Sequence, residues 1–225
     1  MKKEEFNFNG YEATVLIPDK PNGKWIWKTE FFYDFDKAER ALFDKGYTRV
    51  YYRISNKYGS KDAVRLMYEF HNELLKRYSF LCMKAILFGF SRGGLYAFNY
   101  ALNYSERVGK IYFDAPVLNL KSWPHAETNE QRMFFEEYGL SAESFRSFRD
   151  SPIDHLTEFA ENGIPVLLIA GDKDLSVPFN ENGKIMLEYY RAKNKKIRFY
   201  LKKGAGHHPH SLEDVKPILE FIENE

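Results

Sequence analysis

A serine flanked by glycines carries the clearest chemical signal in this chain. Ser91 stands at the centre of the segment 89–93, Gly-Phe-Ser-Arg-Gly, which fits the pattern Gly-x-Ser-x-Gly. The apolar run 85–88 predicts a short buried strand before it, and residues 94–102 have a helix-like composition. A strand, a sharp turn and a helix present a serine hydroxyl at the end of a sheet, above the positive end of the helix dipole. The pattern indicates a nucleophilic serine, although it also suits an ordinary turn with a solvated serine.

A serine hydroxyl is a weak nucleophile at neutral pH, so it needs a base that an acid orients. Candidates for both follow later strand-like runs. The segment 171–178, Gly-Asp-Lys-Asp-Leu-Ser-Val-Pro, follows the apolar run 164–170 and offers Asp172 and Asp174. The segment 204–210, Gly-Ala-Gly-His-His-Pro-His, offers three histidines. The order serine, acid, histidine fits a serine nucleophile with its base.

Together these three segments resemble those of α/β-hydrolases of the esterase and dienelactone-hydrolase-like type, and the resemblance extends over nearly the whole chain from Tyr11. It implies that Ser91 is the nucleophile, Asp174 the acid and His207 the base. It also implies an α/β-hydrolase fold and the cleavage of a carboxylic ester through an acyl-enzyme. No cofactor or metal ion is implied.

Two further acids and two further histidines are alternatives. Asp172 and Asp114 each follow a predicted strand, and Asp172 is also suited to capping its loop through backbone amides. The Gly-x-Gly-His spacing favours His207 as the base, with His208 as a packing neighbour and His210 at a surface or capping position before the last helix. A metal site at these histidines is disfavoured, because no compact set of carboxylates or cysteines accompanies them in the sequence.

A tetrahedral oxyanion needs two backbone donors. The first is expected to be the N–H of Arg92, directly after the nucleophile. The second is expected from the loop after residues 25–27, where Lys-Thr-Glu stands in place of the family's usual His-Gly-x element. Alignment by strand end selects Glu30 as this donor, with Thr29 as the alternative.

Side chains from three loops are expected to contact the substrate: Trp27, Lys28, Asn56, Tyr58 and Trp123. Each has a structural alternative. Lys28 and Glu30 suit a loop ion pair, Asn56 and Tyr58 suit an ordinary turn, and the tryptophans suit the core. The polar groups among them hint at an acylated sugar or another small polar ester.

Strands alternating with helices must position these residues. Strand-like runs are predicted at 11–18, 24–27, 47–54, 85–88, 108–113, 164–170 and 195–201, and helices at about 34–45, 62–78, 94–102, 183–193 and 212–223. The alternation predicts a mostly parallel sheet with helices on both faces and a site at the carboxyl ends of the strands. Residues 118–152 have a looser pattern and are predicted to form a small helical lid within a single domain of residues 1–225.

The amino-acid composition bears on the binding partners and on the cellular location of the protein. The 225 residues include 33 basic and 32 acidic side chains, and the net charge of +1 does not favour nucleic acid or an anionic membrane as a partner. The single cysteine, Cys82, excludes an internal disulfide. The charged start of the chain leads into no apolar signal segment and no run is long enough to span a membrane, so a cytoplasmic location is expected. The oligomeric state stays open.

The function expected from these features is hydrolysis of a small-molecule ester by a serine enzyme. A serine peptidase or thioesterase of the same fold is one alternative. A non-catalytic member that binds a ligand without turnover is another, although a binding protein has no physical need for a serine, an acid and a histidine together.

Overall fold

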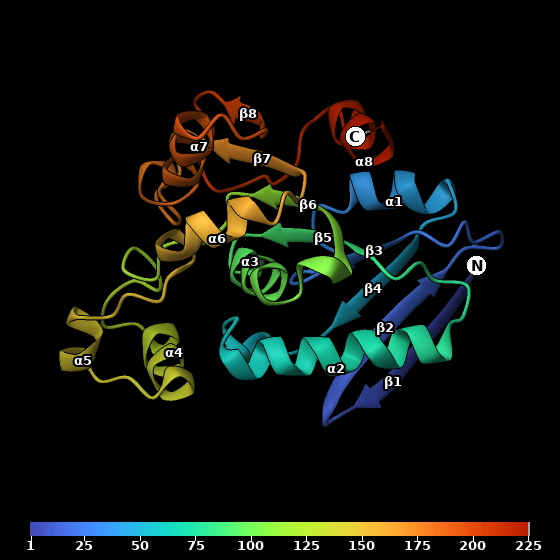
Figure 1. Cartoon of the computed structure of the whole chain (residues 1–225), viewed down its shortest axis with the longest axis horizontal. Coiled ribbons are helices and arrows are strands. Elements are labelled where there is room, and N and C mark those ends of the chain that lie inside the picture. Colours follow the sequence, from blue (N-terminus) through green and yellow to red (C-terminus); the bar gives the residue numbers. More distant parts are fainter. Residues whose placement is uncertain (225) are drawn as a thin grey trace.

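An eight-stranded sheet forms the centre of the computed structural model, which describes residues 1–224 (Figure 1). Its strands are β1 (Lys2–Phe8), β2 (Tyr11–Ile17), β3 (Trp25–Lys28), β4 (Thr48–Tyr52), β5 (Ala85–Phe90), β6 (Val108–Asp114), β7 (Val166–Gly171) and β8 (Arg198–Lys202). They lie in the order β1-β2-β4-β3-β5-β6-β7-β8. Strands β4, β3, β5, β6, β7 and β8 run parallel, and β2 is antiparallel to both β1 and β4. The predicted mostly parallel sheet is confirmed.

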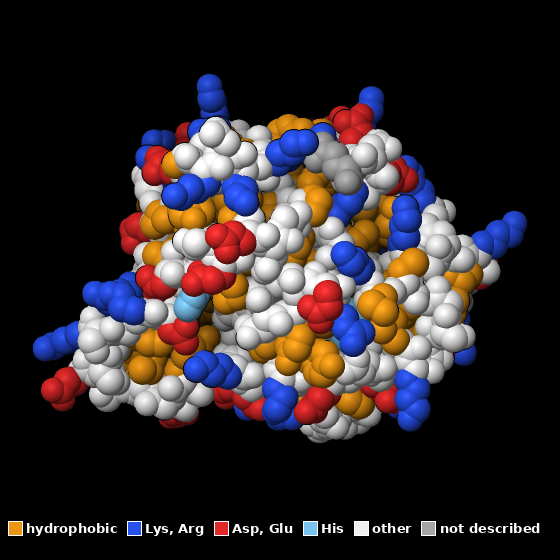
Figure 2. All heavy atoms as spheres, in the orientation of Figure 1, with side chains coloured by type: hydrophobic (Ala, Val, Ile, Leu, Met, Phe, Trp, Pro, Cys, Tyr) orange, Lys and Arg blue, Asp and Glu red, His pale blue; other side chains and the backbone are white. Residues whose placement is uncertain are grey.

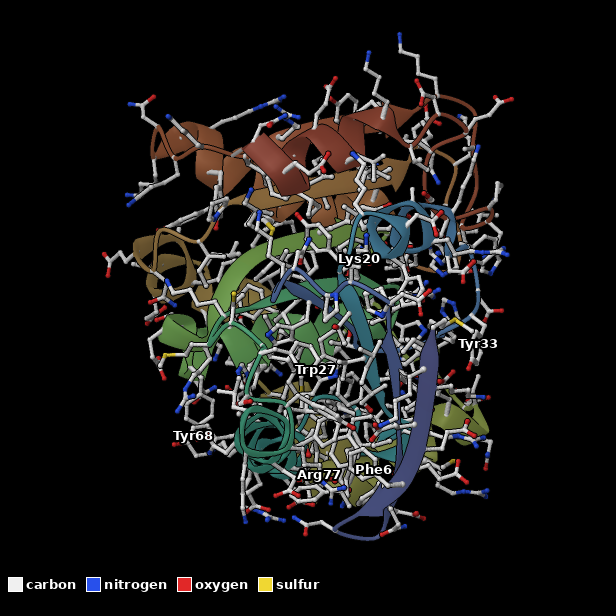
Figure 3. All side chains as sticks on the ribbon, turned by 90° about the vertical axis from the view of Figure 1, so that its right-hand side faces the viewer. Phe6, Lys20, Trp27, Tyr33, Tyr68 and Arg77 are labelled. Atoms are coloured by element: carbon white, nitrogen blue, oxygen red, sulfur yellow. The ribbon has the colours of Figure 1, made fainter. Side chains whose placement is uncertain are left out.

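Strand β1 has no counterpart among the elements predicted from the sequence. Its first half is charged, and its two phenylalanines pack against the core. The guanidinium carbon of Arg77 lies 4.1 Å from the ring centre of Phe6, and Figure 3 shows the two side chains together beside β1. A charged strand of this kind suits the exposed edge of a sheet, where charge discourages pairing with another chain.

Helices cover both faces of the sheet, as predicted. One buried cluster lies beneath α2 (Lys61–Arg77), α3 (Gly93–Asn103), α6 (Leu156–Glu161) and α7 (Gly183–Ala192). A second cluster lies beneath α1 (Lys37–Asp44) and α8 (Lys216–Asn224). Figure 1 shows α1 and α8 on the side of the sheet opposite α2 and α3. Because the two faces are closed by helices, the carboxyl ends of the strands remain for a site.

The last helix begins later than the predicted residue 212. The main-chain N–H of Lys216 donates to Oδ1 of Asp214 at 2.9 Å, which caps the start of α8. Pro217 suits the first turn of a helix, because its missing N–H would have no partner there. Residues 204–215 are therefore largely irregular and carry the three histidines of that segment.

The segment between β6 and β7 carries α4 (Asn129–Tyr138) and α5 (Ala142–Arg146), which extend beyond the sheet in Figure 1. Three hydrogen bonds hold α4 to the loop after β4: Lys57 Nζ to Glu137 at 3.1 Å, Ser60 Oγ to Glu137 at 2.6 Å, and the Tyr138 hydroxyl to the main-chain oxygen of Tyr58 at 3.0 Å. The predicted helical character of residues 118–152 is present. That this segment acts as a lid stays a prediction.

The surface in Figure 2 carries basic and acidic side chains side by side, with small hydrophobic patches between them. This face therefore presents no extended field of one sign. Within residues 1–224, no helix has both the length and the apolar character that crossing a bilayer requires.

Candidate active site

Ser91 lies at the sharp turn between β5 and α3. Its backbone φ angle is +50°, which is rare outside glycine and costs about 1–3 kcal/mol. Hydrogen bonds hold it in place: its N–H donates to the main-chain oxygen of Asp114 at 2.9 Å, and its own oxygen accepts from Gly94 and Val117, each at 2.9 Å. The neighbouring strand and the helix start thus fix the strained turn, and the serine stands at the carboxyl end of the sheet, as predicted.

Two glycines allow the turn to pack so closely. A Cβ atom on Gly94 would lie 2.5 Å from Cβ of Pro116, and one on Gly93 would lie 2.8 Å from Oγ1 of Thr29. Contacts this short do not occur between real side chains, so any other residue would push α3 away from its neighbours. A Cβ atom on Gly89 would lie 2.9 Å from Cβ of Ala97, so close packing explains Gly89 and Gly93, the two glycines of the sequence pattern.

Ser91, His207 and Asp174 form one hydrogen-bonded chain. Nε2 of His207 lies 2.9 Å from Oγ of Ser91, and its Nδ1 lies 2.7 Å from Oδ2 of Asp174. The carboxylate can only accept, so Nδ1 carries the proton and Nε2 accepts from the serine hydroxyl. Oδ1 of Asp174 accepts from the N–H groups of Ser176 (2.9 Å) and Val177 (2.8 Å), which fixes the carboxylate. The side chain of His207 is 11% exposed and that of Asp174 is 1% exposed, so the chain is largely shielded from water.

The two alternative acids have other partners. Oδ1 of Asp172 accepts the N–H of Gly204 at 2.6 Å, so it holds a backbone amide of the histidine segment, whereas its alternative role predicted one of its own loop. The carboxylate of Asp114 contacts His210 instead of His207. Among the described residues, Asp174 is therefore the acid that meets the imidazole of His207.

Asp114 and His210 form a second, fully buried carboxylate–histidine pair. Nδ1 of His210 lies 2.8 Å from Oδ1 of Asp114, whose Oδ2 accepts the Tyr112 hydroxyl at 2.6 Å and the N–H of Ser211 at 2.7 Å. Burial acts to raise the pKa of Asp114, but the hydrogen bond and charge of His210, with Lys202 nearby, outweigh it and lower that pKa. The predicted surface position of His210 is wrong: its side chain is 2% exposed, because its ring pairs with this buried carboxylate.

His208 is exposed and lies beside both other histidines, as expected of a packing neighbour. Its ring stacks on Phe35 with the ring centres 5.4 Å apart. Partial burial, with the nearby His210 and His207, lowers the pKa of His208. Its ring nitrogens have no hydrogen-bond partner within residues 1–224.

Two main-chain amides beside Ser91 are free to bind an oxyanion. Neither the N–H of Arg92 nor that of Glu30 donates a hydrogen bond to any other residue in the described part of the chain. The Glu30 nitrogen lies 3.4 Å from the position that a Cβ on Gly93 would take, so it borders the turn. The N–H of Thr29 donates to the main-chain oxygen of Phe88 at 3.1 Å and is occupied. Of the two candidates on this loop, only Glu30 has an available amide.

The Arg92 side chain bridges two glutamates, a feature that the sequence did not suggest. Its guanidinium contacts Glu30 at 3.1 Å and Glu130, on α4, at 2.8 Å. Ser55 also donates to Glu30, at 3.0 Å. Burial raises the pKa of the Glu30 carboxyl, which the charge of Arg92 counters. The arginine thus ties α4 to the loop that carries the second free amide.

Trp27 and Lys28 do not face the site, which corrects their predicted substrate contacts. Trp27 is 1% exposed and stacks on Trp25 in the core (Figure 3). Lys28 is also 1% exposed, and its ammonium pairs at 2.6 Å with Glu39 of α1. Lys28 therefore does not pair with Glu30 in the loop. It forms a buried ion pair between strand β3 and helix α1.

The other predicted substrate contacts differ in placement. Asn56 is exposed and lines a hollow beside the turn between β1 and β2, with no contact to Ser91. The rings of Tyr58 and Trp123 lie 6.3 Å apart, and the guanidinium carbon of Arg92 lies 5.8 Å from the Tyr58 ring. Tyr58 thus lies beside Arg92, and Trp123 lies beside Tyr58. Both aromatic side chains are buried, and their contact with a substrate stays a prediction.

Surface hollows do not locate this chemistry. A large one is lined by Ile164, Tyr190 and Ile197 near the start of β7 and β8, away from Ser91. Another lies between α1 and the histidine segment and is lined by residues that include Phe35 and His210. The hydrogen-bonded chain at Ser91 marks the site, because it joins the groups that nucleophilic catalysis requires.

Solved structures of hydrolases resemble this fold. A puromycin-hydrolyzing peptidase from Mycobacterium tuberculosis has a TM-score of 0.71 at 14% identity, over 91% of this chain and 36% of that chain. An acylaminoacyl peptidase from Pyrococcus horikoshii has a TM-score of 0.69 at 18% identity, over 92% and 37%. A carboxylesterase from Lactobacillus plantarum has a TM-score of 0.69 at 13% identity, over 92% and 85%. The chain therefore spans little more than a third of the two peptidases, and these identities show the fold alone.

The family is established by sequence. No curated protein matches the chain. The model of the prolyl oligopeptidase family matches residues 44–225, which include Ser91, Asp174 and His207. The predicted α/β-hydrolase superfamily is confirmed by this match and by the fold. The chain belongs to the prolyl oligopeptidase family of serine hydrolases.

Proposed function

We propose that this protein hydrolyses a small carboxylic ester, with Ser91 as the nucleophile, His207 as the base and Asp174 as the acid. The observation that carries the proposal is the hydrogen-bonded chain from Oγ of Ser91 through both ring nitrogens of His207 to Asp174. It supplies each group of a serine, histidine and acid triad in hydrogen-bonding geometry.

In the first step, Oγ of Ser91 attacks the carbonyl carbon while Nε2 of His207 takes its proton. The carbonyl electron pair moves to oxygen, and Asp174 stabilises the imidazolium. Collapse of the tetrahedral intermediate expels the alcohol, which takes the proton from Nε2. Water then attacks the acyl-enzyme in the same way and releases the carboxylic acid and the free serine.

The free amides of Arg92 and Glu30 are the donors for the oxyanion in both tetrahedral intermediates. A fixed donor of this kind typically lowers the activation free energy by about 3–4 kcal/mol, because it is oriented before the charge develops. The start of α3 lies beneath the same atoms and adds the positive end of its dipole.

Support for an ester substrate comes from the comparisons. A carboxylesterase shares this fold as closely as the two peptidases do, with a TM-score of 0.69 beside 0.71 and 0.69, so the fold accommodates ester chemistry. Arg92 places a charged side chain directly after the nucleophile, which suits a small polar ester. A peptidase activity is the second candidate, favoured by the family; the same histidine would then protonate an amine as it leaves.

Labelling with a fluorophosphonate tests the catalytic proposal, because this probe reacts with an activated serine whatever the natural substrate. Wild type should label on Ser91, whereas Ser91→Ala and His207→Ala should not. Ser79→Ala, which removes an exposed serine, should label as wild type does. A folded wild type that fails to label would overturn the proposal and favour a ligand-binding role.

A substrate panel then separates the two candidates. Rates on p-nitrophenyl acetate and on longer acyl esters are compared with rates on aminoacyl and peptidyl p-nitroanilides. Higher kcat/KM for the esters supports the esterase, and higher kcat/KM for the anilides supports the peptidase.

A further inference from the structure

Three histidines of one short segment face each other beside Ser91. The ring centre of His207 lies 4.9 Å from that of His208 and 4.8 Å from that of His210, and the last two lie 5.0 Å apart. We propose that His207, His208 and His210 bind one Zn²⁺ ion, and that this ion reversibly inhibits the enzyme. The inhibition rests on the proposed function, whereas the binding of the ion does not.

The spacing of the rings suits a single metal ion. Three imidazoles on one tetrahedral zinc ion, each with a nitrogen about 2.0–2.1 Å from the metal, have ring centres roughly 5 Å apart. The observed ring centres are 4.8–5.0 Å apart, and one ring nitrogen of each histidine lies within 4.8 Å of the others. Side-chain rotations would have to bring these nitrogens closer when the ion binds. The fourth position would remain for water.

Two of the three rings are already oriented as metal ligands. Nδ1 of His207 faces the carboxylate of Asp174 at 2.7 Å, and Nδ1 of His210 faces that of Asp114 at 2.8 Å. A carboxylate on one ring nitrogen fixes the tautomer and leaves a lone pair on the other, and it makes that nitrogen a stronger ligand. The carboxylates that seemed to be missing from the sequence pattern are supplied by β6 and by the loop after β7.

His208 completes the set and connects it to solvent. It is exposed, and its ring nitrogens have no hydrogen-bond partner in the part of the chain that the structure describes. Phe35 stacks on its ring and limits its orientation. The hollow beside α1 that His210 lines gives an ion access to the buried member of the set.

Inhibition follows from the atom that the metal would take. Nε2 of His207 accepts the hydrogen bond of Ser91 at 2.9 Å, and it is the atom that must receive the serine proton. A lone pair bound to zinc cannot accept a proton, so Ser91 would lose its base. Removal of the metal would restore the free imidazole.

The experiment uses the full chain, treated with EDTA and freed of the chelator. Zn²⁺ binding is measured by calorimetry, Co²⁺ binding by visible absorption, and the state of Ser91 by fluorophosphonate labelling at each Zn²⁺ concentration. We expect one ion per chain, Co²⁺ bands typical of tetrahedral coordination, loss of labelling as the site fills, and recovery with EDTA.

Two variants separate this site from adventitious binding. His208→Gln should label normally without metal, and the Zn²⁺ concentration for half inhibition should rise at least about 10-fold, as expected for the loss of a ligand. His155→Gln, which alters a histidine paired with Asp150, should remain as sensitive as wild type. Absence of metal binding, or equal Zn²⁺ sensitivity in His208→Gln and wild type, would overturn the proposal. Metal binding that depends on His208 in a protein that never labels would support the metal site and refute the hydrolase.

Discussion

The carboxylate of Asp114 accepts a hydrogen bond from Nδ1 of His210 at 2.8 Å, in a position fully closed to solvent. The main-chain oxygen of the same aspartate accepts the N–H of Ser91 at 2.9 Å. One residue therefore positions the nucleophile through its backbone and the histidine segment through its side chain. Asp114 is a positioning residue, since it does not contact His207.

Asp114→Asn should lower both stability and turnover. The substitution removes the negative charge of Asp114, whose carboxylate contacts both His210 and the N–H of Ser211. Breaking a buried pair of this kind costs about 3–5 kcal/mol of stability. Urea denaturation should show a loss of this size, and kcat should fall more than KM rises, because the histidine segment loosens. Tyr112→Phe removes one hydrogen bond to the same carboxylate and should cost only about 1 kcal/mol. An Asp114→Asn protein with wild-type stability and kcat would contradict the positioning role.

Asp174→Asn should lower kcat by about 10⁴-fold with little change in fold, since the amide favours the wrong imidazole tautomer. Asp172→Asn alters the neighbouring acid, whose carboxylate accepts the N–H of Gly204 and no other hydrogen bond from residues 1–224. It should leave kcat within about threefold of wild type, as is usual for a contact outside the reacting groups. Steady-state kinetics on the best ester of the panel measure both. If Asp172→Asn proved the more damaging change, the acid would have to be reassigned.

Gly93→Ala tests the two free amides. The new methyl group would lie 2.8 Å from Oγ1 of Thr29 and 3.2 Å from Cβ of Glu30, so it should push the Glu30 loop away from the turn. Losing one oxyanion donor costs about 10²–10³ in kcat. Gly109→Ala is the matched control, because its methyl group would meet nothing closer than 3.6 Å. Equal kcat values for the two variants would show that the Glu30 amide is not needed.

Lys28→Met should destabilise the protein by about 3–5 kcal/mol, because Glu39 would remain buried without its partner. The double variant Lys28→Met/Glu39→Leu should recover most of this loss, since the pair is replaced by apolar side chains. Chemical denaturation of both variants measures the difference. A double variant no more stable than Lys28→Met would mean that the unpaired Glu39 does not cause the loss.

Acid should destabilise the protein through His71. This histidine lies in the core between the Tyr100 hydroxyl, 2.7 Å from Nδ1, and the main-chain oxygen of Met83, 2.8 Å from Nε2. Burial lowers its pKa from 6.5 to about 4. Between pH 6.5 and about 4, His71 therefore binds a proton in the unfolded chain but not in the folded protein. The contribution of His71 to the free energy of unfolding is fully present above pH 6.5 and falls as the pH drops toward 4.

The full shift corresponds to about 3 kcal/mol. Denaturation of wild type and His71→Phe at pH 7 and at pH 4.5 measures it: the variant should lose less stability on acidification. His125→Gln, at an exposed position, should behave like wild type. An identical acid sensitivity in His71→Phe and wild type would disprove this role.

The features that could be predicted from the sequence are the local ones. The turn at Ser91 is encoded by adjacent glycines and by the apolar run before it, and the order of the acid and histidine segments follows the order of the strands. Helices with one apolar face, such as α2, were placed within a residue or two. Each of these signals lies within a few neighbouring residues, so the structure it encodes can be predicted without knowledge of distant contacts.

The features that could not be predicted depend on partners far apart in the chain. His210 is buried because it pairs with Asp114, 96 positions earlier in the chain. No pattern among neighbouring residues of the sequence predicts this pair. Lys28 is buried because α1 brings Glu39 over it. A charge is normally solvated or paired with a near neighbour in the chain. The sequence therefore predicts a surface or capping position for His210, and a substrate contact or a loop ion pair for Lys28. Strand β1 was missed for a similar reason, since its charged residues resemble a solvated tail until β2 pairs with them.

Arg92 carries two separable properties at one position. Its main-chain N–H donates to no other residue in the described part of the chain, while its guanidinium joins Glu30 to Glu130 on α4. The amide does not depend on the side chain, so this position is open to redesign. Shorter or uncharged residues there would release α4 and enlarge the space above the nucleophile while keeping the donor in place. The range of acceptable substrates is thus adjustable beside the reacting atoms without rebuilding them.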